Sequence, residues 1–160
     1  MIALEGVSVT YRNGHTALRD ASLVVPGCSI TALVGVNGSG KSTLLRLAAG
    51  LLRPTEGRVA LRRTAGEVQG GAWQRSLACL SPELSLYPLL TAAENLAFFL
   101  GLRGVRLSAA SQRDLLARVG LGGAEEWRTL TGSFSTGMRQ RLKLAVLLGA
   151  DAPLWLLDEP

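Results

Sequence analysis

A glycine-rich stretch constrains the fold of this chain more than any other feature of its sequence. Residues 35–43 read Gly-Val-Asn-Gly-Ser-Gly-Lys-Ser-Thr, which has the form G-x-x-x-x-G-K-S/T. The apolar run 30–34 precedes the motif and the apolar run 44–49 follows it, so we expect it between a buried strand and a helix. There the backbone N–H groups can curl around a phosphate chain at the positive end of the helix.

The side chains of this loop have distinct expected roles. Lys41 is expected to reach the outer phosphates of a nucleotide, and the Ser42 hydroxyl to ligate Mg²⁺. The alternative, a glycine-rich turn without a ligand, is disfavoured because the motif and its strand-to-helix setting agree. The other motif residues expected at the phosphates are Gly35, Asn37, Gly38, Ser39, Gly40 and Thr43.

The amino-acid composition is typical of a single globular domain and does not favour a nucleic-acid-binding protein. The 160 residues are 48% hydrophobic, which is enough for the core of one domain of ordinary size. A net charge of +5 could indicate nucleic acid, but the arginines are scattered and aromatic residues make up only 5%. The charge therefore favours an anionic ligand and an ordinary solvated surface, and no nucleic-acid partner is expected.

Other sequence features exclude further classes. Cys28 and Cys79 indicate neither a metal site nor a disulfide framework. The N-terminus lacks the pattern of a signal peptide, and charged residues and a proline interrupt the apolar stretch 142–157, so it predicts no membrane span.

Hydrophobic periodicity predicts a mixed α/β core that carries a helical insertion. Asn13-Gly14 predicts a hairpin turn, and Thr91 with Glu94 three residues later predicts a helix start. Residues 62–74 are expected to form a loop. Strands are expected at 4–11, 18–25, 29–34, 58–61, 76–80 and 154–157, and helices at 44–49, 91–102, 108–119 and 137–148. We expect one domain over 1–160, with a core at 1–83 and 132–160 and a helical subdomain at 84–131.

Two acidic residues follow the last apolar run. Asp158 and Glu159 come directly after residues 154–157, which are expected to form a buried strand. Ligands of open α/β sheets bind at the carboxyl ends of the strands. One carboxylate there can hold Mg²⁺, and its neighbour can act as a base or orient the attacking water. Alone, the pair would be interpreted as exposed turn acids, but the upstream phosphate loop favours the functional interpretation.

A polar turn precedes the helix expected at 137–148. Ser135 and the N–H groups that start this helix can form a second anion site. Taken alone, Ser135 and Gly137 would indicate an ordinary helix N-cap. Their place between the helical insertion and the acidic strand makes the anion site the better interpretation.

This order of motifs resembles the nucleotide-binding domain of ATP-binding cassette (ABC) transporters over nearly the whole chain. Residues 35–43 resemble the Walker A motif, 154–159 the Walker B motif with its catalytic glutamate, and 134–138 the family signature. Tyr11 stands where the family places an aromatic residue that stacks on adenine. The resemblance implies a P-loop NTPase (RecA-like) core with an N-terminal antiparallel β subdomain.

The resemblance also implies site roles and partners. ATP and Mg²⁺ would be gripped by Lys41 and Ser42, Asp158 would support the metal, and Glu159 would activate water. Ser135 and Gly137 would touch ATP held by a second nucleotide-binding domain in a homo- or heterodimer. The dimer would hydrolyse ATP on the cytoplasmic face of a membrane and power a separate permease, which docks near residues 83–102.

The sequence departs from the family pattern at several positions. The family usually has a glutamine before the helical subdomain. At this place the present chain has Pro82 or Glu83 instead. We hypothesise that Glu83 is the substitute, because a carboxylate is also a hard oxygen ligand for Mg²⁺. The signature has Thr136 and Met138 where glycine and glutamine are commonest. It is similar to that of bacterial exporters of the ABC-2 and haem-exporter type.

The family continues beyond the acidic pair with a further strand and a histidine that contacts the γ-phosphate. We therefore expect residues 1–160 to bind ATP but to hydrolyse it poorly alone. His15, the single histidine, is expected to be a surface residue of the hairpin. Two alternatives share the phosphate loop: a soluble ABC-superfamily ATPase that acts on ribosomes or DNA, and a small-molecule P-loop kinase, which would not need Ser135.

Overall fold

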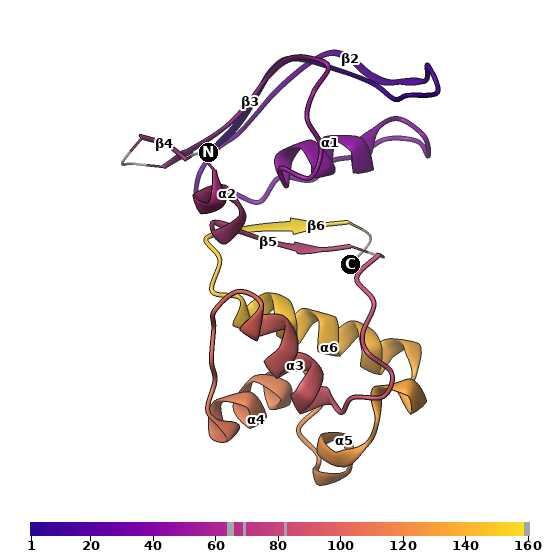
Figure 1. Cartoon of the computed structure of the whole chain (residues 1–160), viewed down its shortest axis with the longest axis vertical. Coiled ribbons are helices and arrows are strands. Elements are labelled where there is room, and N and C mark those ends of the chain that lie inside the picture. Colours follow the sequence, from indigo (N-terminus) through magenta and orange to yellow (C-terminus); the bar gives the residue numbers. More distant parts are fainter. Residues whose placement is uncertain (64–65, 69, 82, 159–160) are drawn as a thin grey trace. The chain divides into compact units, whose positions relative to one another are not determined.

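The computed structural model describes residues 1–63, 66–68, 70–81 and 83–158. They form two compact units, Met1–Leu77 and Ala78–Pro160, which are described separately. Figure 1 labels the helices and strands of both units. The mixed α/β class expected from the sequence is confirmed by strands and helices in each unit.

The first unit is built on an antiparallel sheet with strand order β2-β1-β3-β4. Its strands are β1 (Ile2–Thr10), β2 (Thr16–Val25), β3 (Glu56–Arg63) and β4 (Gly66–Val68). Leu4 of β1 lies opposite Leu23 on one side and Val59 on the other, so β1 is a central strand and most of its apolar residues are buried. This sheet confirms the expected N-terminal antiparallel β subdomain.

The hairpin predicted at Asn13-Gly14 joins β1 to β2 (Figure 1). Gly14 has a φ of 81°, a conformation that glycine adopts without steric cost. The Asn13 side chain accepts a hydrogen bond from the His15 N–H at 3.1 Å, the local bond typical of asparagine in turns. Short-range turn chemistry therefore fixes this part of the fold.

Helix α1 (Lys41–Ala48) follows the glycine-rich stretch and confirms the helix predicted there. Its C-terminal end packs against α2 (Gly71–Arg75), whose Trp73 indole N–H donates to the Ala48 carbonyl at 3.2 Å. The sequence predicted a loop over 62–74, and this prediction is wrong. Pairing with β3 forms β4, and the Trp73 contact holds α2; both are non-local and leave little local signal.

The strand predicted over residues 29–34 is also absent, since this described segment has no regular secondary structure. Ile30 is fully exposed and Val34 is 90% exposed. A central strand depends on hydrogen-bonded neighbours on both sides. Neither sheet of the described residues includes this segment, so its apolar sequence alone does not make it a strand.

The second unit combines a two-stranded sheet with helices. Strands β5 (Leu77–Leu80) and β6 (Leu154–Leu157) pair, and the Asp158 N–H donates to the Leu80 carbonyl at 2.8 Å. Both strands were predicted. The expected full burial of 154–157 is wrong, because Leu156 is buried but Trp155 is 45% and Leu157 44% exposed.

Helices α3 (Ala92–Gly101), α4 (Ala109–Arg118), α5 (Ala124–Arg128) and α6 (Thr136–Gly149) surround the core of this unit (Figure 1). No helix in the described part of the chain has the length and apolar character needed to cross a bilayer. Side chains from α3, α4, α6 and β5 make up the buried cluster, which contains Ala78, Leu80, Ala92, Leu96, Leu100, Leu115, Leu116, Val119, Leu121, Phe134, Leu142, Ala145, Val146, Leu147 and Ala150.

The start of α3 is the reciprocal cap predicted from Thr91 and Glu94. The Thr91 hydroxyl accepts from the Glu94 N–H, and the Glu94 carboxylate accepts from the Thr91 N–H at 2.8 Å. The Thr91 hydroxyl also donates to the Glu94 carboxylate at 2.8 Å. The backbone bond from Thr91 first, and this hydroxyl bond second, lower the pKa of the Glu94 carboxyl. The charged carboxylate is the form that the cap stabilises.

The lowered pKa of Glu94 predicts an acid-dependent loss of stability. A folded-state pKa below the unfolded value contributes stability that is fully present above the unfolded pKa of 4.5 and is lost as pH falls through the folded value. Thermal unfolding followed by circular dichroism between pH 7 and 2.5 should show this loss. In Glu94→Gln the acid-dependent component should be smaller than in the unchanged protein, and identical pH profiles would contradict the prediction.

Asn95 connects three segments of the second unit from a fully buried position. Its side-chain oxygen accepts from the Tyr87 N–H at 2.8 Å. Its amide donates to the Tyr87 carbonyl at 3.0 Å and to the Thr131 hydroxyl at 3.2 Å, and that hydroxyl donates to the same carbonyl at 2.7 Å. The network therefore fixes the segment between Glu83 and α3.

Replacing Asn95 with leucine should destabilise the protein by about 2–4 kcal/mol, because buried polar partners on two segments lose their bonds. Urea unfolding followed by circular dichroism measures this loss. Gln112→Leu is a matched control, since Gln112 makes one side-chain bond, at 3.3 Å to the Leu107 carbonyl. Equal losses of unfolding free energy in the two variants would show that the Asn95 network stabilises the protein no more than a single side-chain hydrogen bond does.

Candidate nucleotide-binding site

The glycine-rich stretch forms a curled loop before α1. The Ser39 N–H donates to the Val36 carbonyl at 3.2 Å, and the Leu44 N–H donates to the Gly40 carbonyl at 2.9 Å. The Lys41 ammonium donates to the carbonyls of Gly35 and Val36, both at 2.8 Å. Lys41 therefore spans the loop from the start of the helix back to its first residues.

Gly40 fits a position where a side chain would not. Its φ is 90°, and an added Cβ would lie 2.7 Å from the Ala17 carbonyl oxygen and 2.8 Å from the Leu18 Cδ2. The loop thus packs closely against β2 at this point. This close approach explains why the motif needs glycine immediately before Lys41.

The start of α1 presents donors to solvent. The first N–H groups of a helix have no acceptor within the helix, and they carry the positive end of its dipole. Gly35, Asn37, Gly38 and Ser39 are exposed, as is Ser42 in the first helical turn. The N–H groups, the Ser42 hydroxyl and the Lys41 charge form a site that suits an anion such as a phosphate chain.

Tyr11 lies beside this loop within the same unit. Its hydroxyl oxygen is 3.1 Å from the Thr43 Oγ1. Its ring is partly exposed and lies parallel to the His15 ring, with an angle of 2° between the planes. The structure therefore brings the predicted adenine-stacking residue next to the predicted phosphate loop.

The acidic residues of the second unit lie near the ends of β5 and β6. Asp158 follows β6, and both Asp158 and the exposed Glu83 are close enough to the half-buried Cys79 to raise the pKa of its thiol, although desolvation is the larger cause. Cys79 therefore stays protonated at neutral pH. Pro82 and Glu159 lie outside the described residues.

Oxygen atoms that suit Mg²⁺ beside a nucleotide occur in each unit. In the described part of the chain, no cluster of three or more His, Cys, Asp or Glu residues could hold a metal ion. Mg²⁺ at nucleotides usually binds one or two protein oxygens and completes its shell with phosphate oxygens and water. The exposed Ser42 hydroxyl of the first unit and the Asp158 and Glu83 carboxylates of the second unit are oxygens of this kind.

Ser135 caps α6 and leaves the first turn of that helix open. Its side chain accepts from the Met138 N–H at 3.2 Å, so the N-cap interpretation is confirmed. Ser135, Thr136 and Gly137 are all exposed, while the preceding Phe134 is buried in the core. The cap leaves the N–H groups of the first two helical residues available to an external anion.

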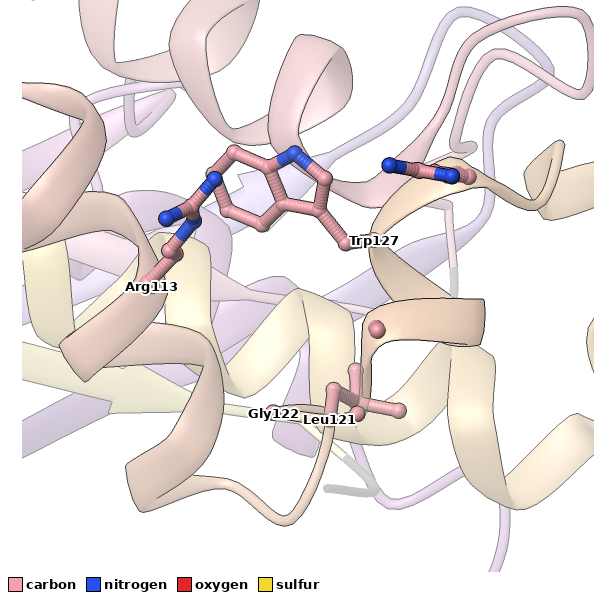
Figure 2. A pocket seen from close by; sticks show the side chains of 7 residues that line it. Arg113, Leu121, Gly122 and Trp127 are labelled. Atoms are coloured by element: carbon pink, nitrogen blue, oxygen red, sulfur yellow. The ribbon is translucent and has the colours of Figure 1, made fainter.

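A cavity of about 380 Å³ lies between α4 and α5, and none of the predicted site residues lines it (Figure 2). The Arg113 guanidinium lies over the Trp127 ring at 5.0 Å from its centroid, a cation–π contact between the two helices. Sequence reasoning missed this pair, because the residues lie on different helices. Its evident role is to hold α5 against α4.

Comparisons with known proteins show the family to which this chain belongs. The ABC transporter family profile matches residues 18–160. The chain is 41% identical over 159 residues to the taurine import ATP-binding protein TauB of Burkholderia thailandensis, covering 96% of this chain and 59% of that protein. It is 35% identical over 161 residues to the cytochrome c biogenesis ATP-binding export protein CcmA of Nitrosospira multiformis, covering 100% of this chain and 77% of that protein.

Solved structures give the same result. The fold matches the dimeric ATP-binding cassette MJ0796 in a post-hydrolysis state with ADP and phosphate, with a TM-score of 0.82 and 27% identity. That match covers 100% of this chain and 74% of the cassette. The chain spans about three fifths of the length of the taurine import proteins it matches. The chain belongs to the ABC transporter family, in which it corresponds to the ATP-binding domain.

Proposed function

We propose that the protein binds and hydrolyses ATP with Mg²⁺ and so powers transport through a separate membrane subunit. The observation that carries this proposal is the exposed loop before α1, which Lys41 holds curled through the Gly35 and Val36 carbonyls. Relatives named as ATP-binding proteins of importers and of an exporter support it. The direction of transport does not follow from them, since both kinds occur at similar identity.

In this proposal, the chain's own residues divide the work of hydrolysis. Lys41 and the N–H groups of the loop neutralise charge on the phosphates, and Ser42 and Asp158 would hold Mg²⁺, which would supply further positive charge against the phosphates. Glu159 accepts a proton from the attacking water. Tyr11 stacks on the adenine ring, and its position beside the loop supports that role.

The nucleotide site is completed by a second copy in the same proposal. Ser135 and the first turn of α6 are exposed, so they can contact the γ-phosphate of ATP bound to another chain. The dimeric state of the related cassette MJ0796 supports the pairing of two chains, which the proposal arranges head-to-tail. Loss of these contacts on hydrolysis would open the pair, which is the logic of other phosphate switches.

Glu83 is proposed to take the place of the family's glutamine as an oxygen ligand near Mg²⁺. Glu83 is exposed in the second unit and, like Asp158, acts electrostatically on Cys79, which supports this assignment. Glu83→Ala should raise the Mg²⁺ concentration needed for half-maximal ATP hydrolysis by the whole protein, while Glu125→Ala, on α5, should not. An unchanged rate and an unchanged Mg²⁺ dependence in Glu83→Ala would remove Glu83 from the site.

The permease is proposed to dock near residues 83–102. In the same proposal, a helical subdomain at 84–131 is carried on a core formed by 1–83 and 132–160. Four apolar side chains of residues 83–102 are exposed, Tyr87, Leu89, Phe98 and Leu102, and exposed apolar groups are common at protein interfaces. This docking would place the protein on the inner face of a membrane.

ATP hydrolysis by the whole protein with its membrane subunit, reconstituted in vesicles, tests the proposal. Hydrolysis should require Mg²⁺ and Lys41 and should be stimulated by transported substrate. Phosphoryl transfer to a small molecule, with no sensitivity to substitution of Ser135, would favour a P-loop kinase. Stimulation by ribosomes or DNA would favour the soluble ATPase.

A further inference from the structure

The contact between Tyr11 and Thr43 links the hairpin to the phosphate loop. The two hydroxyl oxygens are 3.1 Å apart, although the residues are separated by 32 positions in the sequence. Thr43 is the last residue of the loop motif, and it is 7% exposed, whereas the neighbouring Ser42 is exposed. The Thr43 hydroxyl therefore engages the hairpin side of α1.

The backbone of Tyr11 is held independently of Thr43. Its N–H donates to the His15 carbonyl at 2.8 Å, and its carbonyl accepts from the Gly14 N–H at 2.9 Å. With the main chain fixed at both polar groups, the remaining freedom of Tyr11 lies in the rotation of its side chain. The hydrogen bond to Thr43 restricts that rotation.

We propose that Thr43 is a positioning residue that holds the Tyr11 ring in place for the nucleotide base. The inference rests on the proposed ATP-binding function. If the Tyr11 ring is already fixed before ATP binds, binding does not have to include the entropy cost of immobilising that side chain. Loss of the bond should therefore weaken ATP binding by roughly three- to tenfold.

The test separates an effect on the base from an effect on the phosphates. Binding of MgATP and of magnesium tripolyphosphate, which has phosphates but no base, is measured by competition against a fluorescent ATP analogue, using the whole protein. Thr43→Val should weaken MgATP binding three- to tenfold more than it weakens tripolyphosphate binding, because any phosphate contact of Thr43 is common to both ligands. Thr43→Ser keeps the hydroxyl and should restore MgATP binding.

Tyr11→Phe removes the same bond from the partly exposed partner, so the test does not depend on how well a Thr43 variant folds. It should show the same selective loss for MgATP, and the double variant Tyr11→Phe/Thr43→Val should lose no more of the preference for MgATP over tripolyphosphate than either single variant. Equal losses for MgATP and tripolyphosphate, or additive losses of that preference in the double variant, would overturn the inference alone. Binding of neither ligand by the unchanged protein would overturn the proposed function and the inference with it.

Discussion

Replacing Lys41 with alanine is expected to weaken ATP binding by roughly a hundredfold and to abolish hydrolysis. Hydrogen bonds to charged groups are worth about 1.5–3 kcal/mol each, and the ammonium group faces a phosphate chain of high negative charge. The substitution also removes the bonds from Lys41 to the Gly35 and Val36 carbonyls, which hold the loop curled. Titration with a fluorescent ATP analogue measures the loss.

The matched control is Lys143→Ala on α6, which removes the same charge from the only other lysine of the chain. If the loss at Lys41 reflected net charge alone, both variants would weaken binding equally. We expect Lys143→Ala to bind ATP within about twofold of the unchanged protein, since Lys143 lies on α6 of the second unit and is not part of the loop motif. Equal weakening in the two variants would contradict the assigned role of Lys41.

Replacing Gly137 with aspartate is expected to abolish ATP-driven dimerisation without destabilising the single chain. Among the described residues, an added Cβ at Gly137 would have one neighbour within 4 Å, the Ser135 Oγ at 3.9 Å. A carboxylate in the first turn of α6 also interacts favourably with the helix dipole. In the closed pair, however, the same carboxylate would face the γ-phosphate of the second chain's ATP.

Two measurements separate these effects. Thermal unfolding of Gly137→Asp should occur at or slightly above the temperature of the unchanged protein, while sedimentation in MgATP should show only monomer. Gly137→Ala, which adds the Cβ without the charge, should still form a dimer. Dimer formation by Gly137→Asp would contradict the intersubunit role. So would a fall in its unfolding temperature large enough to explain the missing dimer by unfolding of the single chain.

Features set by a few neighbouring residues could be predicted from the sequence. The reciprocal cap at Thr91, the N-cap Ser135 and the turn at Asn13-Gly14 all depend on side chains within three residues of the backbone groups they bind. The loop before α1 is of the same kind, because its curl follows from glycine and lysine at fixed spacing. Local physics was sufficient for these elements.

Features that need distant partners could not be predicted. The apolar run 29–34 looks like a strand, but its apolar content does not supply hydrogen-bonded neighbours. Strand β4 depends on β3, α2 depends on the Trp73 contact with Ala48, and the Asn95 network joins positions up to 44 residues apart. The sequence contains the residues that could form such contacts, but it does not indicate which of them contact one another.

The candidate site divides in the same way. Lys41, Ser42 and the glycines lie in one loop because one motif contains them all. The bond between Tyr11 and Thr43, and the electrostatic effects of Asp158 and Glu83 on Cys79, emerge only once strands and loops are brought together. The roles of Glu159, Ser135 and Gly137 stay predictions, since they concern the reacting water and a second chain.

The central claim is that one chain supplies only half of each ATP site. Sedimentation velocity in MgATP of an equimolar mixture of Lys41→Ala and Gly137→Asp chains tests it most directly. Each variant alone should remain monomeric. In the mixture, the unchanged loop of the Gly137→Asp chain meets the unchanged α6 of the Lys41→Ala chain, so a dimer should appear. A mixture that sediments as the sum of its two monomeric components would contradict the claim.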